Sequence, residues 1–151
     1  MTGQRRHVLG ILENLPEEAL LRPVLPTGWT CAGLVQHLAL DVERFWFRQV
    51  MAGEQVQPDE HGDDSWQVRD GVPAAAVLDR YRREIERADQ IIAATAPEAP
   101  PARWPDFFAP TYHLDNLRQV MLPVITETAC HAGHLDAARE LIDRRQWMVL
   151  A

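Results

Sequence analysis

The chain has 151 residues, of which 46% are hydrophobic and 25% charged, and this composition is typical of one globular domain spanning residues 1–151. Its 22 acidic residues outnumber its 15 basic ones, which gives a formal net charge of −7. A surface of that sign repels a phosphate backbone, so we expect no nucleic-acid partner.

Four segments have the apolar spacing of amphipathic helices, and loops rich in proline or polar residues separate them. Thr30 is a good N-cap for the second of these helices, and Gly53 supplies its stop. No segment has a convincing strand pattern, and residues 54–71 read as a long acidic loop. We therefore predict an all-α four-helix bundle. The predicted helices cover residues 4–15, 30–52, 73–94 and 114–144.

The last helix carries the residues with the clearest chemical meaning. At about 100° per residue, His131 lies roughly 40° from Glu127 and His134 roughly 20° from it on the other side, so all three share one face. A carboxylate and two imidazoles suit a divalent transition metal. A solvent-exposed salt bridge between Glu127 and His131, with His134 solvated, is an equally good interpretation of these residues alone.

Three further residue patterns bear on the packing of the predicted helices. On the helix of residues 30–52, His37 lies on a mixed face with Asp41, where a lone histidine is usually a core-edge residue with a satisfied hydrogen bond. On the third helix, we expect a charged face that contains Arg80 and Glu84 to contact water. Pro123 should kink the last helix one turn before Glu127.

The loop of residues 97–110 contains five prolines together with Trp104, Phe107 and Phe108. Prolines at this density exclude a helix or a central strand, so the aromatic side chains must be buried against the bundle or a partner. They could line a pocket mouth, although packing over the end of the core is the simpler account.

The tail after residue 146 is apolar, and with Trp46 and Phe47 it suggests more exposed apolar surface than a monomer of this size tolerates. On that ground we expect a two-fold homodimer.

The sequence also bears on location and on the cysteines. No signal-peptide pattern and no membrane-length apolar run is present, so we expect a soluble, cytoplasmic protein without a membrane partner. Cys31 and Cys130 are outside any metal-ribbon spacing, and two reduced thiols are the default in that compartment. Cys31 lies near the start of a helix, whose dipole could favour its thiolate, and Cys130 could lie at the edge of the helix face that carries Glu127.

Three motifs in order resemble the DinB-like superfamily, and within it the DUF664 group related to mycothiol-dependent maleylpyruvate isomerase and thiol S-transferase proteins. The resemblance spans nearly the whole chain and implies an up-down-down-up four-helix bundle, often dimeric, with one Zn²⁺ or Ni²⁺ at one end. The motifs are Gly28-Trp-Thr-Cys-Ala-Gly-Leu-Val-Gln-His37-Leu, Val42-Glu-Arg-Phe-Trp-Phe47 and Glu127-Thr-Ala-Cys-His131-Ala-Gly-His134.

Carried onto this chain, the resemblance makes His37, Glu127 and His131 the metal ligands and His134 a fourth or supporting group. Pro123 stands where similar proteins often have histidine, and it could loosen the site. Three protein ligands leave room for water, as in a catalytic zinc site. Asp41 or His134 could then accept a proton.

The implied function is metal-dependent transfer of a low-molecular-weight thiol, such as mycothiol or bacillithiol, to an electrophilic small molecule in detoxification. Two alternatives stay open on the sequence. One is a metal-holding or ligand-binding bundle without turnover, and the other is metal-assisted hydrolysis with the same ligands.

Overall fold

The computed structural model describes residues 1–56 and 64–147, and these parts fold into helices and loops without a strand. The prediction of an all-α fold is confirmed. None of the described helices is long and apolar enough to cross a membrane. The elements in chain order are α1 (Thr2–Ile11), α2 (Glu17–Leu21), α3 (Cys31–His37), η1 (Leu38–Met51), α4 (Ala74–Ala94) and α5 (Leu117–Asp143).

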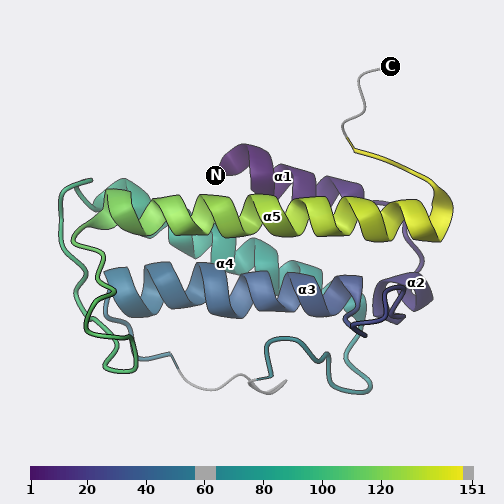
Figure 1. Ribbon diagram of the computed structural model, residues 1–151, viewed down its shortest axis with the longest axis horizontal. Helices are drawn as coiled ribbons and strands as arrows, with labels where there is room; N and C mark the ends of the chain where they lie inside the picture. Colours follow the sequence, from purple (N-terminus) through teal and green to yellow (C-terminus); the bar gives the residue numbers. More distant parts are fainter. Residues whose placement is uncertain (57–63, 148–151) are drawn as a thin grey trace.

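The long elements lie side by side in two directions (Figure 1). Helices α1 and α5 run one way and pack on each other, whereas α3 with η1 and α4 run the opposite way and pack together. The wiring is therefore up-down-down-up, as the resemblance implied. The short helix α2 lies at the end of the bundle where α3 begins (Figure 1).

Local chemistry explains where the helices begin and end. The Thr30 hydroxyl accepts a hydrogen bond from the Gly33 amide at 2.9 Å, which confirms Thr30 as an N-cap, and Asn116 caps α5 in the same way through the Gln119 amide. Helix α5 ends at Asp143, and the residue after it, Arg144, has a left-handed φ of 64° that stops the helix. Because Asn116 caps the helix, α5 begins at Leu117, three residues later than the predicted start at residue 114.

The second predicted helix is one rod that changes its winding. Residues 31–37 are α-helical, and from Leu38 the rod continues as a π-helix, in which amides bond five residues back. The Ala52 amide donates in this way to the Phe47 carbonyl at 3.0 Å. The predicted bounds were right, but apolar periodicity could not distinguish the two windings.

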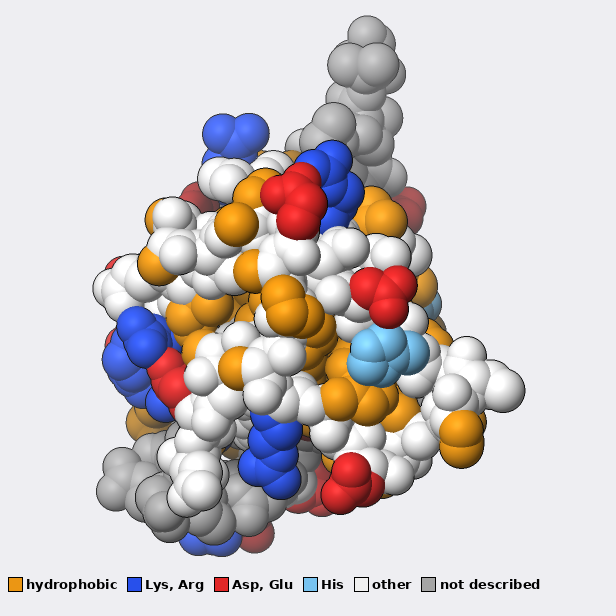
Figure 2. All heavy atoms as spheres, turned by 90° about the vertical axis from the view of Figure 1, so that its left-hand side faces the viewer, with side chains coloured by type: hydrophobic (Ala, Val, Ile, Leu, Met, Phe, Trp, Pro, Cys, Tyr) orange, Lys and Arg blue, Asp and Glu red, His pale blue; other side chains and the backbone are white. Residues whose placement is uncertain are grey.

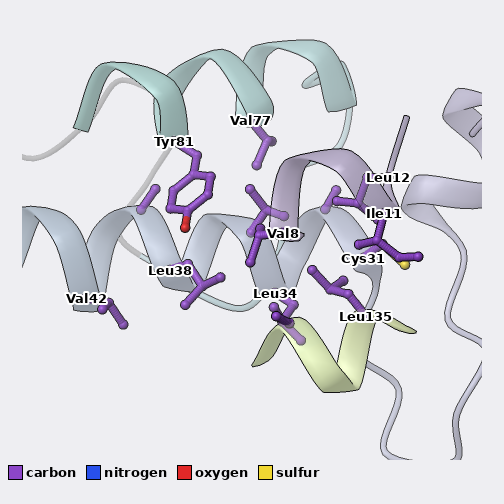
Figure 3. Close-up of a cluster of buried hydrophobic side chains, with 14 of the residues drawn as sticks. Val8, Ile11, Leu12, Cys31, Leu34, Leu38, Val42, Val77, Tyr81 and Leu135 are labelled. Atoms are coloured by element: carbon purple, nitrogen blue, oxygen red, sulfur yellow. The ribbon is translucent and has the colours of Figure 1, made fainter. Parts of the chain in front are cut away.

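The core lies where all the long helices meet (Figure 3). The side chains drawn there come from α1, from α3 with η1, from α4 and from α5, and the Tyr81 ring reaches from α4 toward Leu38. Each is almost fully removed from water, which is the main favourable contribution to folding. The labelled residues are Val8, Ile11, Leu12, Cys31, Leu34, Leu38, Val42, Val77, Tyr81 and Leu135.

Charged side chains are also buried between the helices. Arg5 of α1 donates two hydrogen bonds to Glu43 of η1, at 2.7 and 2.6 Å, and a third to Asp89 of α4. The water-facing prediction for Arg80 and Glu84 was wrong, because their exposed fractions are 2% and 5%. Periodicity could not reveal that neighbouring helices supply partners for these charges.

Two of the apolar side chains expected to be exposed are covered within the chain itself. Phe47 is fully buried in the core, and Trp147 packs back on α1, stacked on His7 with ring centroids 5.5 Å apart and seated against Gly10. Residues 148–151, the rest of the apolar tail, lie outside the described residues, as do residues 57–63 of the predicted acidic loop.

Replacing Arg5 by Ala should destabilise the protein by roughly 3–5 kcal/mol, because it leaves the Glu43 carboxylate buried without its partner. Urea denaturation measures this change. Arg82→Ala is the matched control, since the Arg82 and Asp79 side chains are 51% and 59% exposed and such pairs contribute little. Equal losses in the two variants would contradict the assignment of Arg5 as a buried structural charge.

Candidate metal centre

His37, Glu127 and His131 converge between α3 and α5, although ninety residues separate the first two in sequence. One ligand atom from each lies within 4.8 Å of the other two. His37 is the last residue of α3, and the other two are one turn apart on α5. The structure thus brings together the three residues predicted as metal ligands, and Pro123, which lies inside α5, does not separate them.

The atoms that face the centre of this triad are two imidazole nitrogens and a carboxylate oxygen. His131 Nε2 lies 3.0 Å from Glu127 Oε1, and His37 Nε2 lies 3.5 Å from the same oxygen. His37 Nε2 is buried and has no hydrogen-bond partner among the described residues. A buried polar atom without a partner is unfavourable unless something binds it.

The other nitrogen of each imidazole is held from outside the triad. His37 Nδ1 donates to Asp41 Oδ2 at 2.9 Å, and His131 Nδ1 lies 3.2 Å from His134 Nδ1, one of the two carrying the hydrogen. Partners of this kind fix the orientation of metal-binding histidines. Asp41 and His134, the predicted catalytic residues, therefore contact the proposed ligands directly.

Two pKa values are displaced at the triad. Burial lowers the pKa of His131; the Glu127 carboxylate opposes this, and the neighbouring imidazoles of His37 and His134 add to the decrease. Burial raises the pKa of Asp41, but hydrogen bonds from His37 and Ser65 outweigh it, so the net value is lowered. A neutral imidazole is the form that binds a metal, so the environment favours the binding form of His131.

These residues fit a divalent transition metal. Two nitrogens and one oxygen within reach of one point match the borderline ligands that zinc and nickel accept, and the orphaned His37 Nε2 would gain a partner. The alternative of a Glu127–His131 salt bridge accounts for the 3.0 Å contact of these two residues, but it gives no role to His37, whose Nε2 approaches the same carboxylate from another helix.

Trp66 is the residue of this site that sequence reasoning missed. Its indole stacks on His37, with ring centroids 4.2 Å apart and planes 16° from parallel, and it makes a T-shaped contact with the His131 ring at 5.7 Å. On the sequence, Trp66 was only one residue of the predicted acidic loop of residues 54–71. A large aromatic residue in an acidic loop was the one available signal.

The cysteines are separate from the triad. Both are free: Cys31 is buried and Cys130 exposed. Burial raises the pKa of Cys31 to about 11, against the weaker lowering by Arg139, so the suggestion that the helix dipole favours its thiolate was wrong. Desolvation outweighs the dipole at this position.

The proline-rich loop of residues 97–110, called the aromatic loop below, forms a second feature at the end of the bundle where η1 finishes. Phe108 stacks on Trp46 at 5.7 Å and contacts Trp104 at 5.2 Å, so packing over the bundle end accounts for these rings. Phe107, 75% exposed, helps line a cavity of about 340 Å³ with Phe45. Figure 2 looks onto this end and shows hydrophobic side chains gathered among charged ones.

The fold and the site together define a class: an all-helical bundle whose facing helices bring two imidazoles and a carboxylate to one point. A family model described as mycothiol-S-transferase matches residues 1–144. The chain therefore belongs to the mycothiol-S-transferase family, a DinB-like family of the kind that the three motifs resemble. No curated protein and no solved structure matches the chain.

Metal should bind with about one ion per chain, and removing it should lower the melting temperature. Saturation at 100 to 1,000 times the dissociation constant should stabilise the fold by roughly 3–4 kcal/mol, because the ion binds the folded geometry. His37→Ala and His131→Ala should each abolish stoichiometric zinc, since two ligands remain. His134→Ala should weaken binding by about 10- to 100-fold.

Elemental analysis of untagged protein measures the metal content, and melting curves before and after chelation measure the effect of the metal on stability. His113→Ala is the control, because His113 packs beside Trp104, away from the triad, and should change neither reading. Protein that stays metal-free after dialysis from excess Zn²⁺, with no effect of chelator on melting, would refute the site.

Proposed function

We propose that this protein is a metal-dependent thiol S-transferase that joins a low-molecular-weight thiol, with mycothiol the first candidate, to an electrophilic small molecule in the cytoplasm. The observation that carries the proposal is the triad: three ligand atoms within 4.8 Å, with the outer nitrogen of each imidazole already held. Family membership supports the thiol, and the donor set supports the metal.

The metal, most simply Zn²⁺ with Ni²⁺ as the alternative, would be held by His37, Glu127 and His131. When bound, it would lower the pKa of a thiol near it, so that thiolate forms near neutral pH. In the transfer itself, the thiol loses its proton, the sulfur forms a bond to the electrophilic carbon, and the leaving group departs with the electron pair of the broken bond.

The roles of Asp41 and His134 follow from their existing contacts. Each already makes a hydrogen bond with an imidazole of the triad, and the lowered pKa of Asp41 makes its carboxylate a weak base. We therefore assign them to orienting His37 and His131. Glu127 is 49% exposed, so the thiol proton can pass to solvent on its side of the site.

Metal-loaded protein should accelerate the reaction of mycothiol with a general electrophile such as a chloronitrobenzene, above the rate of free thiol plus metal. Chelation and His131→Ala should each return the rate to that background, whereas Arg82→Ala should leave it unchanged because Arg82 lies on the exposed face of α4. A thiol panel that includes bacillithiol and glutathione would establish the preference.

Stoichiometric metal with no rate for any thiol would favour a non-catalytic metal-binding bundle. Hydrolysis of an activated ester by the same protein, without thiol dependence, would favour the metal-dependent hydrolase instead.

For assembly we retain the homodimer, with α5 as its contact. An exposed face of this helix carries mostly small side chains, with Asp136 at its edge and Glu140 one turn beyond it, so two copies could approach closely there. The open space around Gly133 supports this arrangement. The face consists of Leu122, Thr126, Ala129, Gly133 and Ala137.

Light scattering at micromolar concentration should give about twice the chain mass of 17.2 kDa. Ala129→Arg should reduce it to one chain mass, because a long charged side chain would enter the contact. Ala93→Arg, at an exposed position of α4, should leave the dimer intact. A wild-type mass near 17.2 kDa would exclude the dimer.

A further inference from the structure

We propose that Trp66 is a positioning residue for the metal triad, and that the loop of residues 64–67 fixes its indole against His37. This inference rests on the proposed metal site and adds to it a residue outside the ligand set. The stacking is close and nearly parallel, at 4.2 Å and 16°, and the same indole makes a T-shaped contact with the His131 ring. One side chain thus restrains both imidazoles.

The hydrogen bond to Asp41 does not fix the His37 ring by itself. That bond anchors Nδ1, but the ring can still rotate about the line to its partner. A stacked indole removes this freedom, because rotation of the imidazole would break the parallel contact. With both restraints in place, Nε2 is held toward Glu127 and His131 before any ion arrives.

The loop is attached to α3 by a buried side chain. The Gln36 amide, 1% exposed, donates to the carbonyl oxygens of Asp64 at 2.7 Å and Gln67 at 3.0 Å. The Asp64 carboxylate accepts from the amides of Trp66 and Gln67, which closes the turn. Ser65 bonds to Asp41, so the loop also contacts the residue that orients His37.

Gly33 gives the loop the space it needs. A Cβ atom at this position would lie 2.3 Å from the Trp66 carbonyl oxygen, a distance that requires the backbone of the loop to move. Gln36 and Gly33 occupy one turn of α3, and His37 follows directly. The same helix therefore carries a proposed metal ligand, His37, the side chain that binds the loop, Gln36, and the glycine that leaves space for the loop backbone, Gly33.

The closing experiment measures zinc affinity by competition with a chromophoric chelator, and indole fluorescence during Ni²⁺ titration. Trp66→Ala should weaken zinc binding by about tenfold, in the range seen when a group that orients a ligand is lost. Trp66→Phe should keep affinity within about twofold, since a ring still stacks, but should lose most of the Ni²⁺-dependent quenching. Gly33→Ala should reproduce the loss of affinity by displacing the loop.

Two controls separate this effect from general damage. Gly10→Ala also forces a tryptophan to move, because its Cβ would overlap the Trp147 ring at 2.1 Å, but that contact is on α1 and should leave zinc affinity unchanged. Trp104→Phe removes an indole of the aromatic loop and should leave the Ni²⁺ quenching unchanged.

The outcomes distinguish this inference from the proposed function. Wild-type affinity in Trp66→Ala would overturn the positioning role while the metal site stands. A wild-type protein that binds no metal would overturn both. If Gly33→Ala does not fold, Trp66→Ala decides alone, because its side chain is 37% exposed and its removal leaves no sealed cavity.

Discussion

The site depends on the shared packing of α3 and α5 against one apolar core. Leu34 and Leu38 flank His37 on one helix, while Val124 and Leu135 bracket Glu127 and His131 on the other, and all four apolar side chains are buried. A slip of one residue in α5 would rotate its face by about 100°. Such a slip would expose the valine and leucine, so the hydrophobic register also sets the register of the ligands.

The buried charges add a second restraint to this packing. Arg5 ties α1 to η1 and α4, and Glu84 of α4 accepts from Arg44 and Arg48 of η1. Buried ion pairs are weak evidence for stability, because desolvation offsets most of their attraction. Their geometry is nevertheless specific, and a helix that slipped would leave charges unpaired. They therefore favour one alignment of the helices over alignments shifted along the helix axis.

Much of this arrangement could be predicted from the sequence, for identifiable reasons. Apolar periodicity located the long helices, Thr30 as an N-cap predicted where one of them begins, and the spacing of Glu127 and His131 predicted that both lie on one face. The third ligand, His37, came from a family resemblance, because local spacing on one helix says nothing about which residues of another helix face it. Periodicity also failed for Arg80 and Glu84, where buried partners replace water.

Trp66 marks the limit of sequence reasoning most clearly, because its position depends on bonds from Gln36 and on space at Gly33, both far from it in sequence. Neither contact leaves a periodic signal. The same short stretch of α3 breaks other local preferences as well. His37 keeps a buried nitrogen with no hydrogen-bond partner in the described part of the chain, and the helix changes to π winding at the next residue, an irregularity often found at functional sites. Both irregularities fall at or next to a residue proposed to hold the metal, which is where a functional constraint would override local preferences.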